Sequence, residues 1–299
     1  MPAIKNAMAA TTRTPNNFFD EVVACKKIPY DNHADAEMAL TPHAETFVAD
    51  GWQRRWRLIT QKIQQVDTLE EEKDLLRRIC SPARAVEVAF ANAHAMNCVA
   101  QSQSFFNALC SADWVLRDGS GIATLFRLLG KNPGFNLNGT DLIPKIIGLF
   151  NGRRIAFFGT QEPYLQRGMD AAHQHAPLSH FVSAHGFLEL DDYLSLVISH
   201  RSELIVLGMG MPKQEAVAAA LRSKLGFPCT IVCGGAIIDF LAGRTTRAPL
   251  WMRRAGMEWL YRLSKEPRRL SHRYVVGNPV FLIRAIWLAA SGGTKTWSD

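Results

Sequence analysis

The sequence predicts an α/β fold, with a mostly parallel sheet flanked by helices and a basic helical appendage at its C-terminal end. Two observations support this fold class. Apolar segments of strand length alternate with helical patterns from Val86 to Phe240, which is typical of βα units in a parallel sheet. After Gly243 the composition changes to closely spaced arginine and aromatic residues. We therefore expect a poorly ordered extension over residues 1–50, a main domain over 51–243 and the appendage over 244–299.

Composition and charge limit the class of protein. The chain has 299 residues, 47% of them hydrophobic, which is enough for one large α/β domain with appendages. Its six cysteines form no C-x-x-C pair, which favours reduced thiols in a cytosol. The sequence contains no signal-peptide core and no uncharged apolar stretch of about 18 residues. We therefore expect a cytoplasmic protein that is neither exported nor integral to a membrane.

The positive charge is concentrated in the appendage. Residues 244–299 contain eleven Lys or Arg and three Asp or Glu, an excess of eight, whereas the whole chain has a formal net charge of +7. A basic appendage on a nearly neutral body favours an anionic partner: membrane lipid, a phosphorylated substrate or nucleic acid.

The first elements precede the candidate site. Residues 1–50 show no sustained period, and no function is assigned to them. The pattern from Arg55 to Val66 is short and mixed. Thr68, followed three residues later by Glu71, predicts a capped helix at the start of the folded domain.

A strand over Val86–Phe90 leads into a loop with two polar residues, Asn92 and His94, before a helix that continues to Phe106. We keep Asn92 and His94 as catalytic candidates. His94 binds a hydroxyl or a phosphate, or it forms only local hydrogen bonds.

The next segment is a strand, a tight turn and a helix. Trp114–Leu116 is apolar, and helical spacing resumes at Ile122. Asp118 lies on the turn between them, at the edge of a parallel sheet where ligands collect. Gly119 and Gly121 allow close approach of a substrate, so the Asp118 carboxylate can act as a general base toward a hydroxyl. The alternative is that Asp118 only caps the following helix.

The second half of the main domain continues the alternation. A helix begins in the motif Asn138-Gly139-Thr140-Asp141, with Thr140 or Asp141 as its expected cap. Further strands are predicted over residues 153–158, 180–184, 203–207 and 229–233.

Glycine turns after the last two strands favour a nucleotide site. Gly208 and Gly210 follow one strand, and Gly234 and Gly235 follow the other. Such turns and helix N-termini hold phosphates with backbone amides. The first turn lacks the third glycine of the dinucleotide fingerprint G-x-G-x-x-G, and the sequence has no P-loop motif.

The appendage is predicted to contain an amphipathic basic helix. Apolar residues fall at helical spacing from Trp251 to Leu263, with arginines between them. Such a helix suits the surface of an anionic membrane. The alternative, which is compatible, is a docking helix whose apolar face packs on the same protein.

Together these motifs resemble the WecG/TagA/CpsF family of bacterial glycosyltransferases, glycosyltransferase family 26. The resemblance runs from about Ala85 to Trp287. Many family members have a threonine two residues before the loop asparagine, where this chain has Phe90. The matching segments are DG-x-G-I at 118–122, NGTDL at 138–142, G-x-G-x-PKQE at 208–215, GGAIIDFLAG at 234–243 and RAPLWMRRAGMEWLYRLSKEPRRLSHRYVVGNP at 247–279.

The resemblance implies an inverting transferase with a Rossmann-like sheet. Its donor is a UDP-sugar, and its acceptor is a polyprenyl-diphosphate-linked saccharide in exopolysaccharide or other cell-surface polysaccharide synthesis. It implies a peripheral enzyme on the cytoplasmic face of the plasma membrane, bound to an anionic surface, with no nucleic acid partner, and it is compatible with a homo-oligomer. The appendage helps to complete the active site, and Asp118 is the general base.

Inverting transfer needs one carboxylate to take the proton while cations and amides stabilise the departing diphosphate. No D-x-D pair lies in a suitable loop, so we expect neither a metal nor another cofactor, and arginines of the appendage take the metal's role. Gln214 or Asp239 is expected to contact the uridine. The expected substrate-binding residues are Gly119, Gly121, Asn138, Thr140, Asp141, Gly208, Gly210, Lys213, Gln214, Glu215, Gly234, Gly235, Asp239, Arg247, Arg253 and Arg254.

Two alternative functions stand beside this interpretation. One is an oxidoreductase with a nucleotide cofactor, which the missing fingerprint and the missing early acidic partner for a ribose count against. The other is a non-enzymatic, membrane-bound regulator that retains a nucleotide site.

Overall fold

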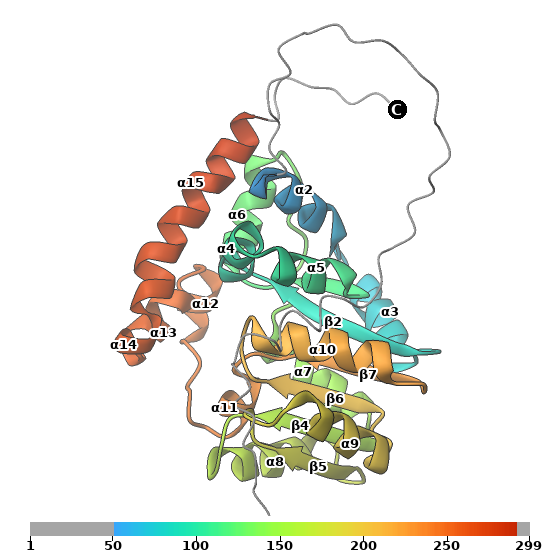
Figure 1. The fold of residues 1–299 in the computed structure, drawn as a ribbon. Coiled ribbons are helices and arrows are strands. Elements are labelled where there is room, and N and C mark those ends of the chain that lie inside the picture. The colour runs from blue at the N-terminus through green and yellow to red at the C-terminus, as the bar shows by residue number, and fades with distance from the viewer. Residues whose placement is uncertain (1–50, 292–299) are drawn as a thin grey trace, which may run out of the picture. The chain divides into compact units, whose positions relative to one another are not determined.

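The computed structural model describes residues 51–291, which form one parallel sheet with helices on both faces (Figure 1). The predicted extension over residues 1–50 lies outside this range. Seven strands lie in the order β1-β3-β2-β7-β6-β4-β5, and neighbours are parallel throughout. This confirms the predicted α/β class. The strands are β1 (Ile63–Gln64), β2 (Ala85–Ala91), β3 (Trp114–Arg117), β4 (Arg154–Gly159), β5 (His180–Ala184), β6 (Leu204–Gly208) and β7 (Cys229–Cys233).

Helices connect successive strands, and a further group of helices forms the appendage. The helices of the main domain are α2 (Trp52–Lys62), α3 (Leu69–Cys80), α4 (Ala93–Gln101), α5 (Gln103–Ser111), α6 (Ser120–Leu128), α7 (Gly139–Leu149), α8 (Tyr164–His175), α9 (Leu190–His200), α10 (Lys213–Lys224) and α11 (Ile237–Leu241). The appendage consists of α12 (Leu250–Arg254), α13 (Glu258–Lys265), α14 (Pro267–Ser271), the π-helix η1 (His272–Val276) and α15 (Gly277–Ala290).

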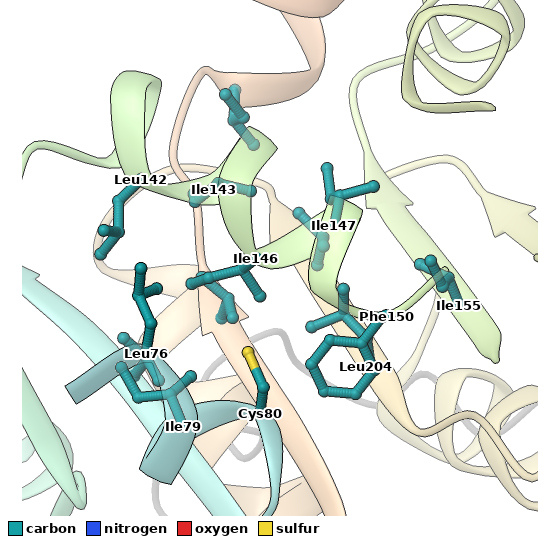
Figure 2. Packing of buried hydrophobic residues seen from close by; sticks show 14 of the residues in the cluster. Leu76, Ile79, Cys80, Leu142, Ile143, Ile146, Ile147, Phe150, Ile155 and Leu204 are labelled. Carbon is teal, nitrogen blue, oxygen red and sulfur yellow. The ribbon is translucent and has the colours of Figure 1, made fainter. Parts of the chain in front are cut away.

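Two buried clusters, one on each face of the sheet, join the helices to the strands. Val88 of β2 belongs to the first and its neighbour Ala89 to the second, as the alternation of side chains along a strand requires. The first cluster contains side chains of α3, α7, α8 and α11, and the second contains those of α2, α4, α5, α6 and α15. Figure 2 shows Ile146 of α7 pointing toward Cys80 of α3 within the first cluster. Because both faces are covered, strands such as β6 and β7 are almost entirely apolar and could be recognised from the sequence.

The predicted cap of α3 is confirmed. The Oγ1 atom of Thr68 accepts a hydrogen bond of 3.2 Å from the backbone amide of Glu71. The Glu71 carboxylate in turn accepts from the amide of Asp67 at 2.7 Å, one residue before the cap itself. Two amides at the start of the helix are thereby satisfied.

Replacing Thr68 with alanine should lower the free energy of unfolding by about 1 kcal/mol, because the amide of Glu71 loses its acceptor. Urea unfolding monitored by circular dichroism measures this change. Ser111→Ala serves as the control, since its hydroxyl binds only the carbonyl of Ala108 at the end of α5. A loss as small as that of the control would contradict a stabilising cap.

The part of the predicted main domain that precedes the capped helix contains regular structure. The segment from Arg55 to Val66, which had looked short and mixed, belongs mainly to α2 and β1. Trp56 and Ile59 of α2 are fully buried, and the indole Nε1 of Trp56 donates to the carbonyl oxygen of Met96 at 2.7 Å. The helix is therefore stabilised by contacts with α4 that a local pattern does not reveal.

Two predicted helix boundaries were wrong. The helix expected to continue to Phe106 is interrupted at Ser102, whose hydroxyl caps α5 by accepting from the amide of Phe105 at 3.1 Å. At the start of α7 the cap is Asn138, not Thr140 or Asp141, because the Asn138 Oδ1 accepts from the amide of Asp141 at 3.0 Å.

The single amphipathic helix expected in the appendage is also wrong. Gly256, with φ of +71°, separates α12 from α13. The long helix α15 packs against α4 and α6 (Figure 1), with Phe281, Ala285 and Leu288 buried in the second cluster. The helix that docks is α15 and not the predicted segment from Trp251 to Leu263, because α12 and α13 contain no buried residue. None of the helices within residues 51–291 has the length and apolar character needed to cross a bilayer.

Candidate active site

A cavity of about 520 Å³ lies where β2, β3, β6 and β7 end, and the appendage closes one of its sides. The strands are parallel, so the loops that follow them all meet at this edge of the sheet. The loops after β2 and β3 contribute Asn92 and Asp118, and those after β6 and β7 contribute the glycine turns. The appendage adds side chains from α12, α13, α14, η1 and α15.

Asp118 is oriented by the neighbouring loop. Its amide donates to the carbonyl oxygen of Ala91 at 2.9 Å, and its Oδ2 accepts from the Nδ2 of Asn92 at 3.1 Å. The other side-chain atom of Asn92, Oδ1, caps α4 by accepting from the amide of Ala95 at 3.0 Å. Gly119 is the cap residue of α6, and no side chain caps that helix. The alternative that Asp118 only caps α6 is therefore wrong.

Arg117, which the sequence analysis did not single out, holds the turn that carries Asp118. Its buried guanidinium donates to the carbonyl oxygens of Gly134 at 2.8 Å, Phe135 at 3.0 Å and Gly119 at 3.2 Å. Gly119 adopts a φ of +86°, a conformation that residues with a Cβ rarely reach. The Asp118 carboxylate is thus presented from a turn fixed at several points.

Four arginines of the appendage line the cavity: Arg253, Arg262, Arg269 and Arg273. The Nε atoms of Arg253, Arg262 and Arg273 are buried and have no hydrogen-bond partner within residues 51–291. The guanidinium of Arg262 lies 5.3 Å from the ring centre of Phe240. Burial lowers the pKa of Arg273, but a guanidinium stays protonated in proteins. This side of the cavity therefore favours an anion.

His94 also lines the cavity, and its surroundings disfavour the charged form. Burial, followed by the nearby charges of Arg273 and His272, lowers the pKa of His94 to about 4. Its Nε2 lies 3.8 Å from the Sγ of Cys98. At neutral pH the imidazole is uncharged and a weak base, better suited to hydrogen bonding than to proton abstraction. Its catalytic role stays a prediction.

A second carboxylate, that of Glu258, enters the cavity from α13. Burial raises its pKa, and the charge of Asp118 adds to this effect, while Arg247 opposes it. Among residues 51–291, no three His, Cys, Asp or Glu side chains come together as a metal site. That no metal is needed stays a prediction.

The structure brings most of the predicted site residues to this cavity. Asp239 lines it, and its Oδ1 accepts from the hydroxyl of Thr160 at 2.7 Å and lies 3.4 Å from the Nη1 of Arg244. The predicted residues on its wall are Asn92, His94, Asp118, Gly119, Gly121, Asn138, Thr140, Gly208, Gly210, Gln214, Gly234, Gly235, Asp239 and Arg253.

Five predicted residues lie outside the cavity wall. Asp141 and Arg247 form an ion pair, with 3.1 Å between Oδ2 and Nη2. The Nζ of Lys213 donates to the carbonyl oxygen of Gly186 at 2.9 Å. Glu215 is buried behind the wall, and Arg254 is exposed on α12. Direct binding by these residues stays a prediction.

Sequence reasoning missed most of the contribution of the appendage, although one signal was present. Arg262, Arg269 and Arg273 are spaced by seven and four residues, which places them on one side of a helical segment. The prediction relied instead on the apolar residues at helical spacing from Trp251 to Leu263. The other missed wall residues include Thr124, Asn136, Phe240, Glu258, Trp259, Tyr274, Asn278, Phe281 and Leu282.

The comparisons with known proteins agree with this geometry. A curated relative from Staphylococcus aureus (strain MW2), named N-acetylglucosaminyldiphosphoundecaprenol N-acetyl-beta-D-mannosaminyltransferase, is 23% identical over 202 residues, which is 66% of this chain and 78% of the relative. The protein of the same name from strain NCTC 8325 / PS 47 has the same values, and that from strain MRSA252 is 22% identical over 201 residues, again 66% and 78%. The model of the glycosyl transferase WecG/TagA/CpsF family matches residues 56–294, which include every residue of the cavity wall. The chain therefore belongs to the WecG/TagA/CpsF family of glycosyl transferases.

Proposed function

We propose that this protein is an inverting glycosyltransferase that transfers a sugar from a UDP-sugar to a polyprenyl-diphosphate-linked saccharide in cell-surface polysaccharide or exopolysaccharide synthesis. The observation that carries the proposal is that the Asp118 carboxylate and the appendage arginines face one cavity. The carboxylate can accept the proton of an incoming hydroxyl, and the arginines can stabilise a departing diphosphate. The relatives' names supply the acceptor class, a sugar on diphosphoundecaprenol.

The proposed reaction is a single displacement at the anomeric carbon of the donor. An acceptor hydroxyl attacks from the side opposite to the diphosphate, and its proton passes to Asp118 as the new C–O bond forms. The bond from the anomeric carbon to the diphosphate oxygen breaks, and its electron pair leaves with UDP. Arg253, Arg262 and Arg273 stabilise the charge that develops there. Asn92 keeps the carboxylate in the orientation that the transfer needs.

The proposed place of work is the anionic inner face of the plasma membrane, where a polyprenyl-linked acceptor is found. Helix α15 and the end of η1 carry exposed apolar side chains, and the exposed Arg268 of α14 precedes them in the chain. Apolar side chains beside basic ones suit a peripheral contact with lipid headgroups. The exposed apolar residues are Val275, Val276, Leu282, Ile283, Ile286 and Trp287.

UDP should raise the unfolding midpoint of the protein, whereas NAD should leave it unchanged. At a hundredfold excess over its dissociation constant, a ligand adds about 2.7 kcal/mol, which is about 5 to 10 °C for a domain of this size. Thermal unfolding by fluorescence measures the shift. Stabilisation by NAD alone would support the oxidoreductase alternative and contradict the transferase.

The same preparation then separates an enzyme from a regulator. UDP release is measured with a panel of UDP-sugars, headed by UDP-N-acetylmannosamine because of the relatives' names, and a lipid-linked N-acetylglucosamine acceptor. Release that depends on both substrates supports the transferase. Stabilisation by UDP without any turnover across the panel would favour the non-enzymatic regulator.

A further inference from the structure

Gln214 joins the two glycine turns at the wall of the cavity. Its side chain is fully buried in the first turn of α10. The side-chain Oε1 accepts one hydrogen bond from the amide of Gly210 at 3.2 Å and another from the amide of Gly235 at 2.9 Å. A single oxygen atom thus connects the turn after β6 with the turn after β7.

Glu215 determines which way the Gln214 amide faces. The Nε2 of Gln214 donates to the Oε1 of Glu215 at 2.8 Å, and Glu215 is fully buried. Backbone amides only donate, so the oxygen of the Gln214 side chain must face the glycines and its NH2 group must face the carboxylate. If the side-chain amide turned over, its NH2 would meet two N–H groups and its oxygen would meet Glu215. The carboxylate therefore holds the amide in the useful orientation.

The turns need such an anchor. Gly210 and Gly235 have φ values of +80° and +59°, and no atom lies within 4 Å of the position that a Cβ would occupy on either residue. The space beside these two residues is therefore open, and glycine is the residue that most freely changes conformation. The hydrogen bonds to Gln214 restrict the backbone there. The same bonds engage the amides of Gly210 and Gly235, so these two amides are not the ones that face a bound phosphate.

We propose that Glu215 is a positioning residue which, through Gln214, holds both glycine turns in the conformation that receives the nucleotide diphosphate of the donor. The identity of that ligand rests on the function proposed above. The connection between the turns rests on the hydrogen bonds alone, and the two are tested separately.

An exchange of the two side chains tests the proposal. Gln214→Glu keeps an acceptor for both glycine amides but places a second carboxylate against Glu215. The double variant Gln214→Glu/Glu215→Gln restores the pair with reversed polarity, because the amide introduced at position 215 can donate to the carboxylate introduced at position 214. Gln214→Met removes the connection without burying a charge, and it replaces Gln214→Glu if that variant does not fold. Glu87→Gln is the control for a changed buried carboxylate, because Glu87 of β2 is fully buried and its charge reaches Glu215, while its carboxylate forms no hydrogen bond with either glycine turn.

The first measurement needs no ligand. Protein labelled with 15N-glycine reports hydrogen exchange at the amides of Gly210 and Gly235. At pH 8 we expect protection at both amides to fall at least tenfold in Gln214→Glu and to return in the double variant, with Glu87→Gln unchanged. Protection that survives in both Gln214→Glu and Gln214→Met would overturn the proposed connection.

The second measurement gives KM and kcat for the UDP-sugar donor. We expect Gln214→Glu to raise KM for the UDP-sugar about tenfold or more at pH 8, with a smaller change in kcat, and the double variant to restore KM. If the double variant raises KM as much as Gln214→Glu does, the positioning role is overturned and direct binding by Gln214 is indicated. If wild-type protein fails to bind UDP, the proposed function fails, while the exchange measurement still decides whether the turns are joined.

The pH profile separates this role from a general loss of structure. Burial raises the pKa of Glu215 to about 7, and the ionisable groups that face it are Glu87 of β2, Cys98 of α4 and Cys233 of β7. In Gln214→Glu the two carboxylates can share one proton at low pH, so the KM defect should shrink between pH 8 and pH 6. Neither wild type nor the double variant should show this recovery. If the increase in KM caused by Gln214→Glu is the same at pH 6 and pH 8, the proposal is contradicted.

Discussion

Replacing Asp118 with asparagine should lower kcat by two or more orders of magnitude while UDP binding and the unfolding midpoint stay nearly unchanged. Asparagine has the same shape, and its side-chain oxygen can still accept the hydrogen bond from Asn92. An amide cannot take the proton of the acceptor hydroxyl, so the loss falls on the chemical step. Steady-state UDP release gives kcat, and calorimetry gives the dissociation constant of UDP.

The matched control is Asp192→Asn, the same change on the exposed first turn of α9. It should retain wild-type turnover. If Asp118→Asn keeps more than about a tenth of the wild-type rate, Asp118 is not the base. His94→Gln then becomes the next variant, although the pKa of about 4 makes His94 a weak base.

The parts of the fold that could be predicted are those that local sequence determines. β5 and β7 were predicted with their observed bounds. β7 is covered on both faces, which selects a short apolar segment ended by turn residues, whereas β5 is a half-exposed strand at the edge of the sheet. The edge of the sheet that holds the cavity followed from the same alternation, since parallel strands bring all of their following loops to one side. Asp118 could be selected because it stands on such a loop immediately before Gly119 and Gly121.

The rest depended on contacts between distant segments. α2 is held by Trp56 against α4, and Arg117 acts through carbonyl oxygens near residue 134, so neither leaves a local pattern. In the appendage, Gly256 separates α12 from α13, and Arg262 and Arg273 from the segments that follow line the cavity. The sequence-based prediction named Arg247, Arg253 and Arg254, which follow the last glycine turn. Of these, Arg247 instead pairs with Asp141.

Arg273→Gln should lower kcat/KM by about two to three orders of magnitude and weaken UDP binding, because a preorganised cation is lost where the diphosphate charge develops. The guanidinium comes from a π-helix, an irregular element often found at functional sites, and its Nε has no partner within residues 51–291. Arg273→Lys should recover only part of the rate, since an ammonium keeps the charge but lacks the bidentate fork. Steady-state kinetics and calorimetry with UDP measure both effects.

The unfolding midpoint distinguishes a role of Arg273 in stabilising the diphosphate from a role in stabilising the fold. Burial disfavours the charged form of Arg273 and lowers its pKa, so without an anion the side chain is held at the expense of stability. Arg273→Gln should therefore unfold at the same temperature as wild type or at a higher one, while the variant has lost most of its activity. Arg268→Gln, on the exposed side of α14, should change neither property. A lower midpoint together with unchanged kcat/KM would show that Arg273 serves the fold, and the leaving group would then depend on Arg253 and Arg262.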